Sequence, residues 1–168
     1  MSYVSEAQVA KNDETGLNLS TASETNYTTM QVLMAQGGAG VLDFIAGPQD
    51  SMRELAYKEY FLDLSAVLTK EQSDLYEPYF LYMDMGVIEQ RQEAYDNMED
   101  SASIPLPVTM SPEDMEKPIP IFIDISQCEK VVDAYGYDVG PLAFGFMANS
   151  PNPDMTLDFI EYLMQELQ

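Results

Sequence analysis

Apolar residues recur at helical spacing through the middle of this chain and gather into short continuous runs nearer its end. The segment 51–68 has Leu55 and Leu62 on its apolar side. Ser51 lies three residues before Glu54, which is the spacing of a capping box, in which each of the two side chains bonds the other residue's backbone amide. We therefore expect a helix from about residue 51 to residue 68.

The residues that follow predict two more helices. Thr69 and Gln72 repeat the capping-box spacing and mark the start of another helix. Pro78 should break or kink that helix, because proline has no amide hydrogen to donate. The helical pattern resumes at Tyr79 and predicts a further helix that ends near Asn97.

The last third of the chain predicts strands as well as helices. Continuous apolar runs at 119–125 and 142–147 are rich in Ile and Phe and predict two strands. Ser126 and Glu129 have capping-box spacing again, so a short helix should lie between these strands. A final helix is expected from Asp154. The apolar stripe that it would bury consists of Leu157, Ile160, Met164 and Leu167.

A proline-rich segment, residues 101–120, divides the chain, and within it 111–114 predicts a single helical turn. We expect an α+β fold in one compact domain, with a helical lobe over 29–100. Packed with it, residues 101–168 should form a small lobe of two or more strands and two helices. Residues 1–28 are rich in Ser, Thr and Asn and predict a flexible or docking arm.

Charge narrows the possible partners. The chain has 29 Asp and Glu against 7 Lys and Arg, no His, and a formal net charge of −22. Direct binding to nucleic acid or to an anionic membrane is disfavoured, because both depend on basic residues that neutralise phosphates. The most apolar stretch, 30–46, is too short and too interrupted to span a bilayer. The composition favours a basic protein surface as the partner.

The residue types needed for common catalysis are missing. Without His, neither a Ser-His-Asp nor a Cys-His arrangement can be assembled. Cys128 and Asp124 are each better explained as structural residues, and no segment has the ligand pattern of an EF-hand. We predict a protein that is not an enzyme and has no metal or cofactor. The single cysteine and the absence of a recognisable leader favour the cytoplasm.

The candidate binding residues form acidic stripes. The longest stripe consists of Glu89, Glu93, Asp96 and Asp100. Spacings of four, three and four place these acids on one helix face, where each like-charged pair costs about 0.2–0.5 kcal/mol. Solubility alone explains such a costly arrangement poorly. The remaining predicted binding residues are Glu71, Asp74, Glu77, Glu59, Asp63, Tyr79 and Tyr82, with Tyr76, Met83, Met85 and Tyr95 as further apolar anchors.

These features lead to a hypothesis and two alternatives. The first is a nucleic-acid mimic that occupies the basic groove of a nuclease, a restriction enzyme, a CRISPR effector or a similar protein. Its size and composition are similar in type to phage-encoded inhibitors of this kind, without a shared motif. The alternatives are a virion structural or assembly protein or acidic chaperone, with 1–28 and 30–46 as contacts, and an immunity protein against a basic toxin. Homo-oligomerisation stays open.

Overall fold

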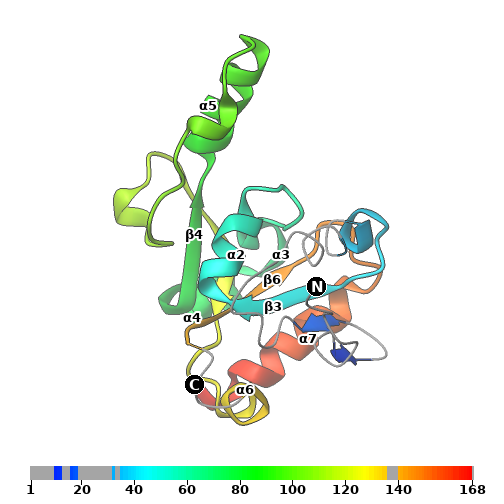
Figure 1. Ribbon diagram of the computed structural model, residues 1–168. Helices are drawn as coiled ribbons and strands as arrows, with labels where there is room; N and C mark the ends of the chain where they lie inside the picture. The colour runs from blue at the N-terminus through cyan, green and yellow to red at the C-terminus, as the bar shows by residue number, and fades with distance from the viewer. Residues whose placement is uncertain (1–9, 13–15, 19–31, 33–34, 136–139, 168) are drawn as a thin grey trace.

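The computed structural model describes residues 10–12, 16–18, 32, 35–135 and 140–167, and it confirms the α+β fold (Figure 1). The strands are β1 (Ala10–Asn12), β2 (Gly16–Asn18), β3 (Phe44–Pro48), β4 (Phe80–Asp84), β5 (Pro118–Asp124) and β6 (Leu142–Phe146). The helices are α2 (Gln49–Ala56), α3 (Leu64–Val67), α4 (Lys70–Tyr76), α5 (Met85–Asp96), α6 (Glu129–Tyr135) and α7 (Pro153–Met164). Short 3-10 turns are η2 (Glu77–Tyr79), η3 (Ser101–Ser103), η4 (Pro112–Asp114) and η5 (Gln165–Leu167). The sheet has the order β1-β2-β3-β6-β5-β4, and only β2 and β3 are parallel neighbours.

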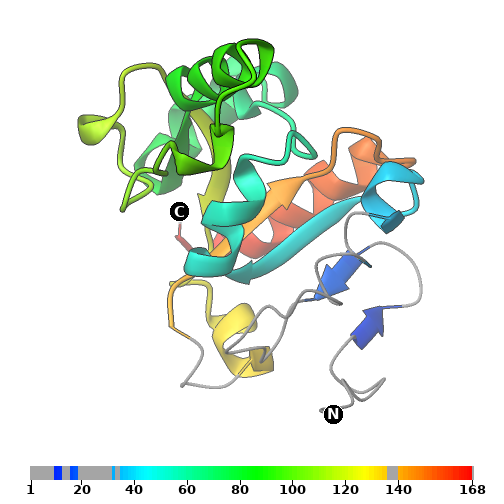
Figure 2. The same cartoon turned by 45° about the horizontal axis from the view of Figure 1, so that its top comes forward.

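Helices cover both faces of the central strands (Figure 2). Because successive strand residues point to opposite faces, Ile45 and Phe44 enter different apolar clusters. Ile45 lies in the cluster that contains Met52 of α2. The Phe44 ring stacks on that of Phe144, with centroids 4.7 Å apart, in the cluster that contains Ile160 of α7. Each face therefore has its own buried core.

The single helix predicted over 51–68 is wrong, because α2 and α3 are separate elements. Glu59 has a φ of 59°, a left-handed conformation that ends the helical path. The chain then runs beside the end of β6, where the Leu62 amide donates to the Phe146 carbonyl at 2.9 Å. Pairing with a distant strand outweighs the local helical pattern here.

The capping boxes predicted at Ser51 and at Thr69 have different outcomes. The box at Thr69 and Gln72 is confirmed at the start of α4, with the reciprocal bonds at 3.2 Å and 2.9 Å. The box predicted at Ser51 is wrong, because α2 begins at Gln49, before Ser51. Pro48 occupies the N-cap position, and no side chain forms a capping hydrogen bond there.

Strand β4 replaces the first part of the helix predicted from residue 79. A 3-10 turn that contains Pro78 follows α4, and the chain then extends so that Leu81 pairs with Phe122 of β5. A short continuous apolar run has neither helical nor strand periodicity, so its pairing partner decides its structure. The helix prediction is thus wrong over 79–84 and confirmed over 85–96.

The elements predicted for the last third of the chain are confirmed as η4, β5, α6, β6 and α7. The capping box predicted at Ser126 and Glu129 is wrong, because α6 begins only at Glu129. The Ser126 hydroxyl instead accepts from the Leu142 amide at 2.8 Å and so ties the end of β5 to β6. Asp124 accepts from the Ser126 amide at 2.9 Å, a structural contact at the end of β5. Cys128 is buried, and its sulfur lies 3.9 Å from that of Met164.

Two arginines hold the proline-rich segment, Arg53 from α2 and Arg91 from α5. Arg53 donates to the Val108 carbonyl, and Nη2 of Arg91 donates to the Ile104 carbonyl at 2.7 Å. Strands from both sides of residue 100 hydrogen-bond in the same sheet, so the two predicted lobes share one sheet.

The predicted arm over 1–28 is described only at β1 and β2, and its other residues lie outside the described ones. Within the apolar stretch 30–46, Leu42 and Ile45 are buried in the core. Among the described residues, no helix combines the length and the apolar content that a bilayer crossing needs.

Candidate functional site: an acidic arm

Helix α5 projects away from the sheet (Figure 1). It follows β4 directly, and the chain returns from its far end through η3 and the proline-rich segment. We call residues 85–100 the acidic arm. The far end of the arm stands clear of the sheet and of the helices that cover it in Figure 1, and η3 packs back against α5.

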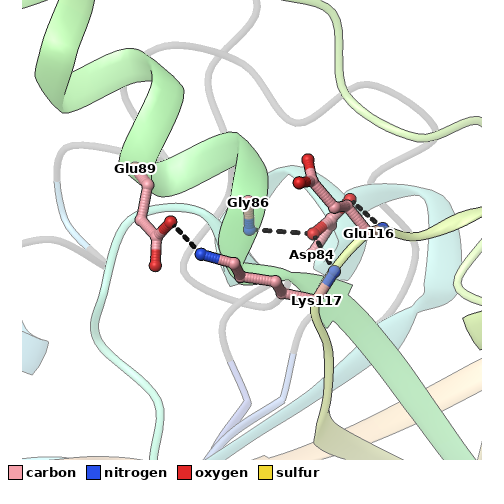
Figure 3. A network of polar contacts seen from close by, with 5 residues as sticks. All are labelled: Asp84, Gly86, Glu89, Glu116 and Lys117. Carbon is pink, nitrogen blue, oxygen red and sulfur yellow. Dashed lines mark hydrogen bonds and ion pairs between the residues drawn. The ribbon is translucent and has the colours of Figure 1, made fainter.

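The arm is fixed at its root by the buried carboxylate of Asp84, which is 6% exposed (Figure 3). Its Oδ1 accepts from the Gly86 amide at 2.8 Å and from the Lys117 amide at 2.9 Å. Its Oδ2 accepts from the Glu116 amide at 2.9 Å. The Asp84 amide in turn donates to the Tyr57 hydroxyl at 3.0 Å. One residue therefore joins the start of α5 to the segment that enters β5.

The Asp84 carboxyl is held in its ionised form. Burial by itself would raise its pKa, but the amides of Glu116, Lys117 and Gly86 outweigh burial and lower the pKa below its usual value of 3.8. Burial raises the pKa of the Tyr57 hydroxyl, which keeps its proton. The root is thus a charged acceptor surrounded by donors, as a structural anchor requires.

Near the root, Glu89 forms an ion pair with Lys117 (Figure 3). It is the single ion pair found among the described residues. The hydrogen bond that Lys117 donates to Glu89 raises the pKa of the lysine. Glu89 was predicted as a partner-binding residue, but its charge is already compensated by a neighbour from the sheet.

The acids toward the far end of the arm are Glu93, Asp96, Glu99 and Asp100, and all four are exposed. Asp96 accepts from the side-chain amide of Gln92, an uncharged partner, at 2.9 Å. Asp100 lies beyond the end of α5, where it caps η3 through the Ala102 amide at 3.0 Å. The prediction that Asp100 shares the helix face is therefore wrong. Within the described part of the chain, no side-chain partner is found for Glu93 or Glu99.

The far end of α5 closes with a left-handed residue that is not glycine. The Met98 amide donates to the Tyr95 carbonyl at 3.0 Å, and the Glu99 amide donates to the Ala94 carbonyl at 2.8 Å, as in a Schellman motif. Met98 has a φ of 58°, at the position where glycine is usual. A side chain there costs roughly 1 kcal/mol relative to glycine.

The other predicted acids do not join the arm in one surface. Glu71 and Asp74 on α4, with Glu77 on η2, precede β4, whereas the arm follows it, so these two groups lie at opposite ends of the strand. Glu59 lies after α2, and Asp63 is the N-cap of α3. The predicted set is thus divided into at least three places.

The predicted apolar anchors lie mostly inside the fold. Tyr76 and Met83 are buried, and Tyr79 and Tyr82 are half-buried. Burial, followed by the nearby charge of Glu77, raises the pKa of Tyr82. Tyr95, which is 72% exposed, is the anchor that does reach the surface. Sequence reasoning missed Met98, which is 97% exposed, because spacing along a helix says nothing about its terminal turn.

Several basic residues are engaged within the fold. Arg53 and Arg91 donate to carbonyls of the proline-rich segment, and Lys117 donates to Glu89. Lys130 donates to the Tyr162 carbonyl at 3.1 Å and lies over the Tyr162 ring. None of these contacts reaches the far acids of the arm, so their negative charge faces solvent.

Across the described ranges, no three Asp, Glu or Cys side chains come together in a group that could hold a metal ion. Comparisons with family models, with curated proteins and with solved structures found no match. The chemistry of the arm is therefore the basis for a functional proposal.

Proposed function

We propose that this protein is a non-enzymatic acidic binding protein that acts as a nucleic-acid mimic. Its acidic arm would enter the groove of a basic nucleic-acid-binding protein, such as a nuclease, a restriction enzyme or a CRISPR effector, and exclude the nucleic acid. The observation that carries the proposal is the projecting end of the arm, where Glu93, Asp96, Glu99 and Asp100 are exposed with no lysine or arginine in contact among the described residues.

The charge density of the arm is compatible with this role. Acids at spacings of three and four recur about once per helical turn, or roughly every 5.4 Å along the axis. One strand of duplex DNA carries one charge per roughly 3.4 Å of axis. A groove built to attract phosphates would therefore meet the charges of Glu93 and Asp96 on α5, continued by Glu99 and Asp100 just beyond the helix end.

The cost of the arrangement argues against a purely solubilising role. Glu89 and Glu93, and then Glu93 and Asp96, are like-charged pairs at helical spacing and oppose the helix by a few tenths of a kcal/mol each. Only Glu89 gains a compensating lysine. Acids placed on separate elements would give the same solubility without this repulsion.

In the test, the full chain captures binding proteins at low salt, and duplex DNA is then used to elute the captured protein. The eluted protein is identified, and its affinity for the chain is measured at several salt concentrations. We expect the affinity to fall steeply with salt and duplex DNA to compete for the same surface. The arm variant Glu93→Gln, Asp96→Asn, Glu99→Gln, Asp100→Asn should bind roughly tenfold more weakly or worse.

The matched control removes the same charge from other elements: Glu54→Gln, Asp74→Asn, Glu129→Gln and Asp158→Asn. These acids are exposed on α2, α4, α6 and α7. The control should lose less than about threefold in affinity, since rim charges contribute little each. Equal losses in the two variants, or binding that duplex DNA does not displace, would contradict the proposal.

A further inference from the structure

We infer that Tyr95 and Met98 form an apolar anchor at the end of the acidic arm, and that its partner is a basic surface with an apolar pocket in its centre. This inference rests on the proposed function and adds the chemistry of the contact. A partner without such a pocket, such as a uniformly charged flat surface, would bind only through charge.

Exposure is the first support. Met98 is 97% exposed and Tyr95 is 72% exposed, and the two are joined by the backbone hydrogen bond that closes the helix. Tyr and Met are enriched in the centres of protein interfaces, where they fill pockets on the partner. Elsewhere on the described surface, Val108 is 84% exposed but lies in the proline-rich segment that Arg53 holds, and Tyr162 is 51% exposed with Lys130 over its ring. Val41 is 61% exposed, and Leu75 and Met155 are each 45% exposed.

The surroundings of the pair determine the partner. Asp96, Glu99 and Asp100 are its neighbours along the chain, and all three are exposed. An apolar pocket would bury Tyr95 and Met98, while lysines and arginines around its rim would form ion pairs with the neighbouring acids. A second copy of this chain fits poorly, because its surface carries the same excess of negative charge.

The shape of the arm supports insertion of its end into a recess. The pair lies at the far end of a projecting helix, away from the sheet (Figure 1). An end that projects in this way can enter a recess on a partner. Met98 thus places an exposed apolar side chain at a left-handed backbone position where glycine would cost less free energy.

The experiment uses two peptides of equal charge as probes. Each has eight lysines, which alternate with leucine in one and with serine in the other. The full chain should bind the Lys–Leu peptide roughly tenfold more tightly than the Lys–Ser peptide, by calorimetry or fluorescence anisotropy. The variant Tyr95→Ala, Met98→Gly should lose most of that preference and keep its affinity for the Lys–Ser peptide. Its denaturation midpoint should not fall, since Met98→Gly removes a strained side chain.

The control variant Leu75→Ala, Met155→Ala removes apolar surface from α4 and α7 and should keep the preference. An unchanged preference in the Tyr95→Ala, Met98→Gly variant, or the absence of any preference in the natural chain, overturns the inference. Those outcomes leave the proposed function intact if the variant that neutralises the four far acids still binds both peptides more weakly than the scattered four-acid control does. Failure of that charge effect would instead count against the proposed function itself.

Discussion

At the scale of single residues, Asp84 has the largest structural role in the candidate site. Its carboxylate accepts three backbone hydrogen bonds, from Gly86, Glu116 and Lys117, and it is almost completely buried. Three backbone donors favour the charged form of a buried carboxylate. The sequence distinguishes it from other acids only by its place after an apolar run.

Asp84→Asn should destabilise the fold by on the order of 2 kcal/mol at pH 7, because the amide replaces a charged acceptor and turns donors toward backbone amides. Since the pKa of Asp84 is lowered in the folded protein, its contribution is complete above the usual value of 3.8 and is lost as pH falls through the lower, folded value. Urea unfolding of both proteins between pH 7 and pH 2 measures the difference, which should shrink below pH 4.

Asp114→Asn is the matched control, because Asp114 is exposed on η4 and the substitution removes the same charge. It should change stability by less than about 0.5 kcal/mol. A difference between Asp84→Asn and the natural protein that stays constant down to pH 2 would contradict the role given to the carboxylate.

At the scale of elements, the helix starts depend on local caps to different degrees. Helix α4 begins with the reciprocal bonds of Thr69 and Gln72, whereas α5 begins with Asp84, which accepts from the Gly86 amide. The first cap is complete within four residues. The second cap, at Asp84, also depends on hydrogen bonds from the residues before β5, so the cap is complete only when the sheet has formed.

Thr69→Ala should destabilise the protein by about 1 kcal/mol, because the Gln72 amide loses its acceptor. Thr69→Ser keeps the hydroxyl and should stay within about 0.5 kcal/mol of the natural protein. Chemical denaturation monitored by circular dichroism compares the three proteins. Equal stability of the Ala and Ser variants would show that the cap contributes nothing.

At the scale of the whole molecule, negative charge acts against the compact state. The net charge is −22, and the described residues contain the single ion pair of Glu89 with Lys117. Most of the described acids are exposed, on nearly every helix. Burial of the two apolar clusters has to offset their mutual repulsion.

Sodium chloride should accordingly stabilise the protein. Between 0.05 M and 0.5 M salt, screening of the exposed acids should raise Tm by at least about 2–4 °C, equivalent to roughly 1 kcal/mol for a chain of this size. Differential scanning calorimetry measures the shift. The scattered four-acid control variant should begin with a higher Tm and gain less from salt. A Tm that falls or stays constant would contradict net repulsion.

The sequence by itself determined the features that depend on neighbours a few residues away. These include the capping box at Thr69, the apolar stripe of α7, and the spacing of Glu89, Glu93 and Asp96 along α5. The overall excess of acid is likewise a property of composition. Periodicity and caps are short-range effects, so they can be inferred without tertiary structure.

Only the tertiary structure decided which residues pair across long separations and which remain exposed. Lys117 neutralises Glu89 from 28 positions away, and Arg53 holds Val108 from 55 positions away. The apolar run 80–84 became a strand because β5 was there to pair with it. Burial of one tyrosine and exposure of another follow from packing between distant segments, which no local pattern encodes.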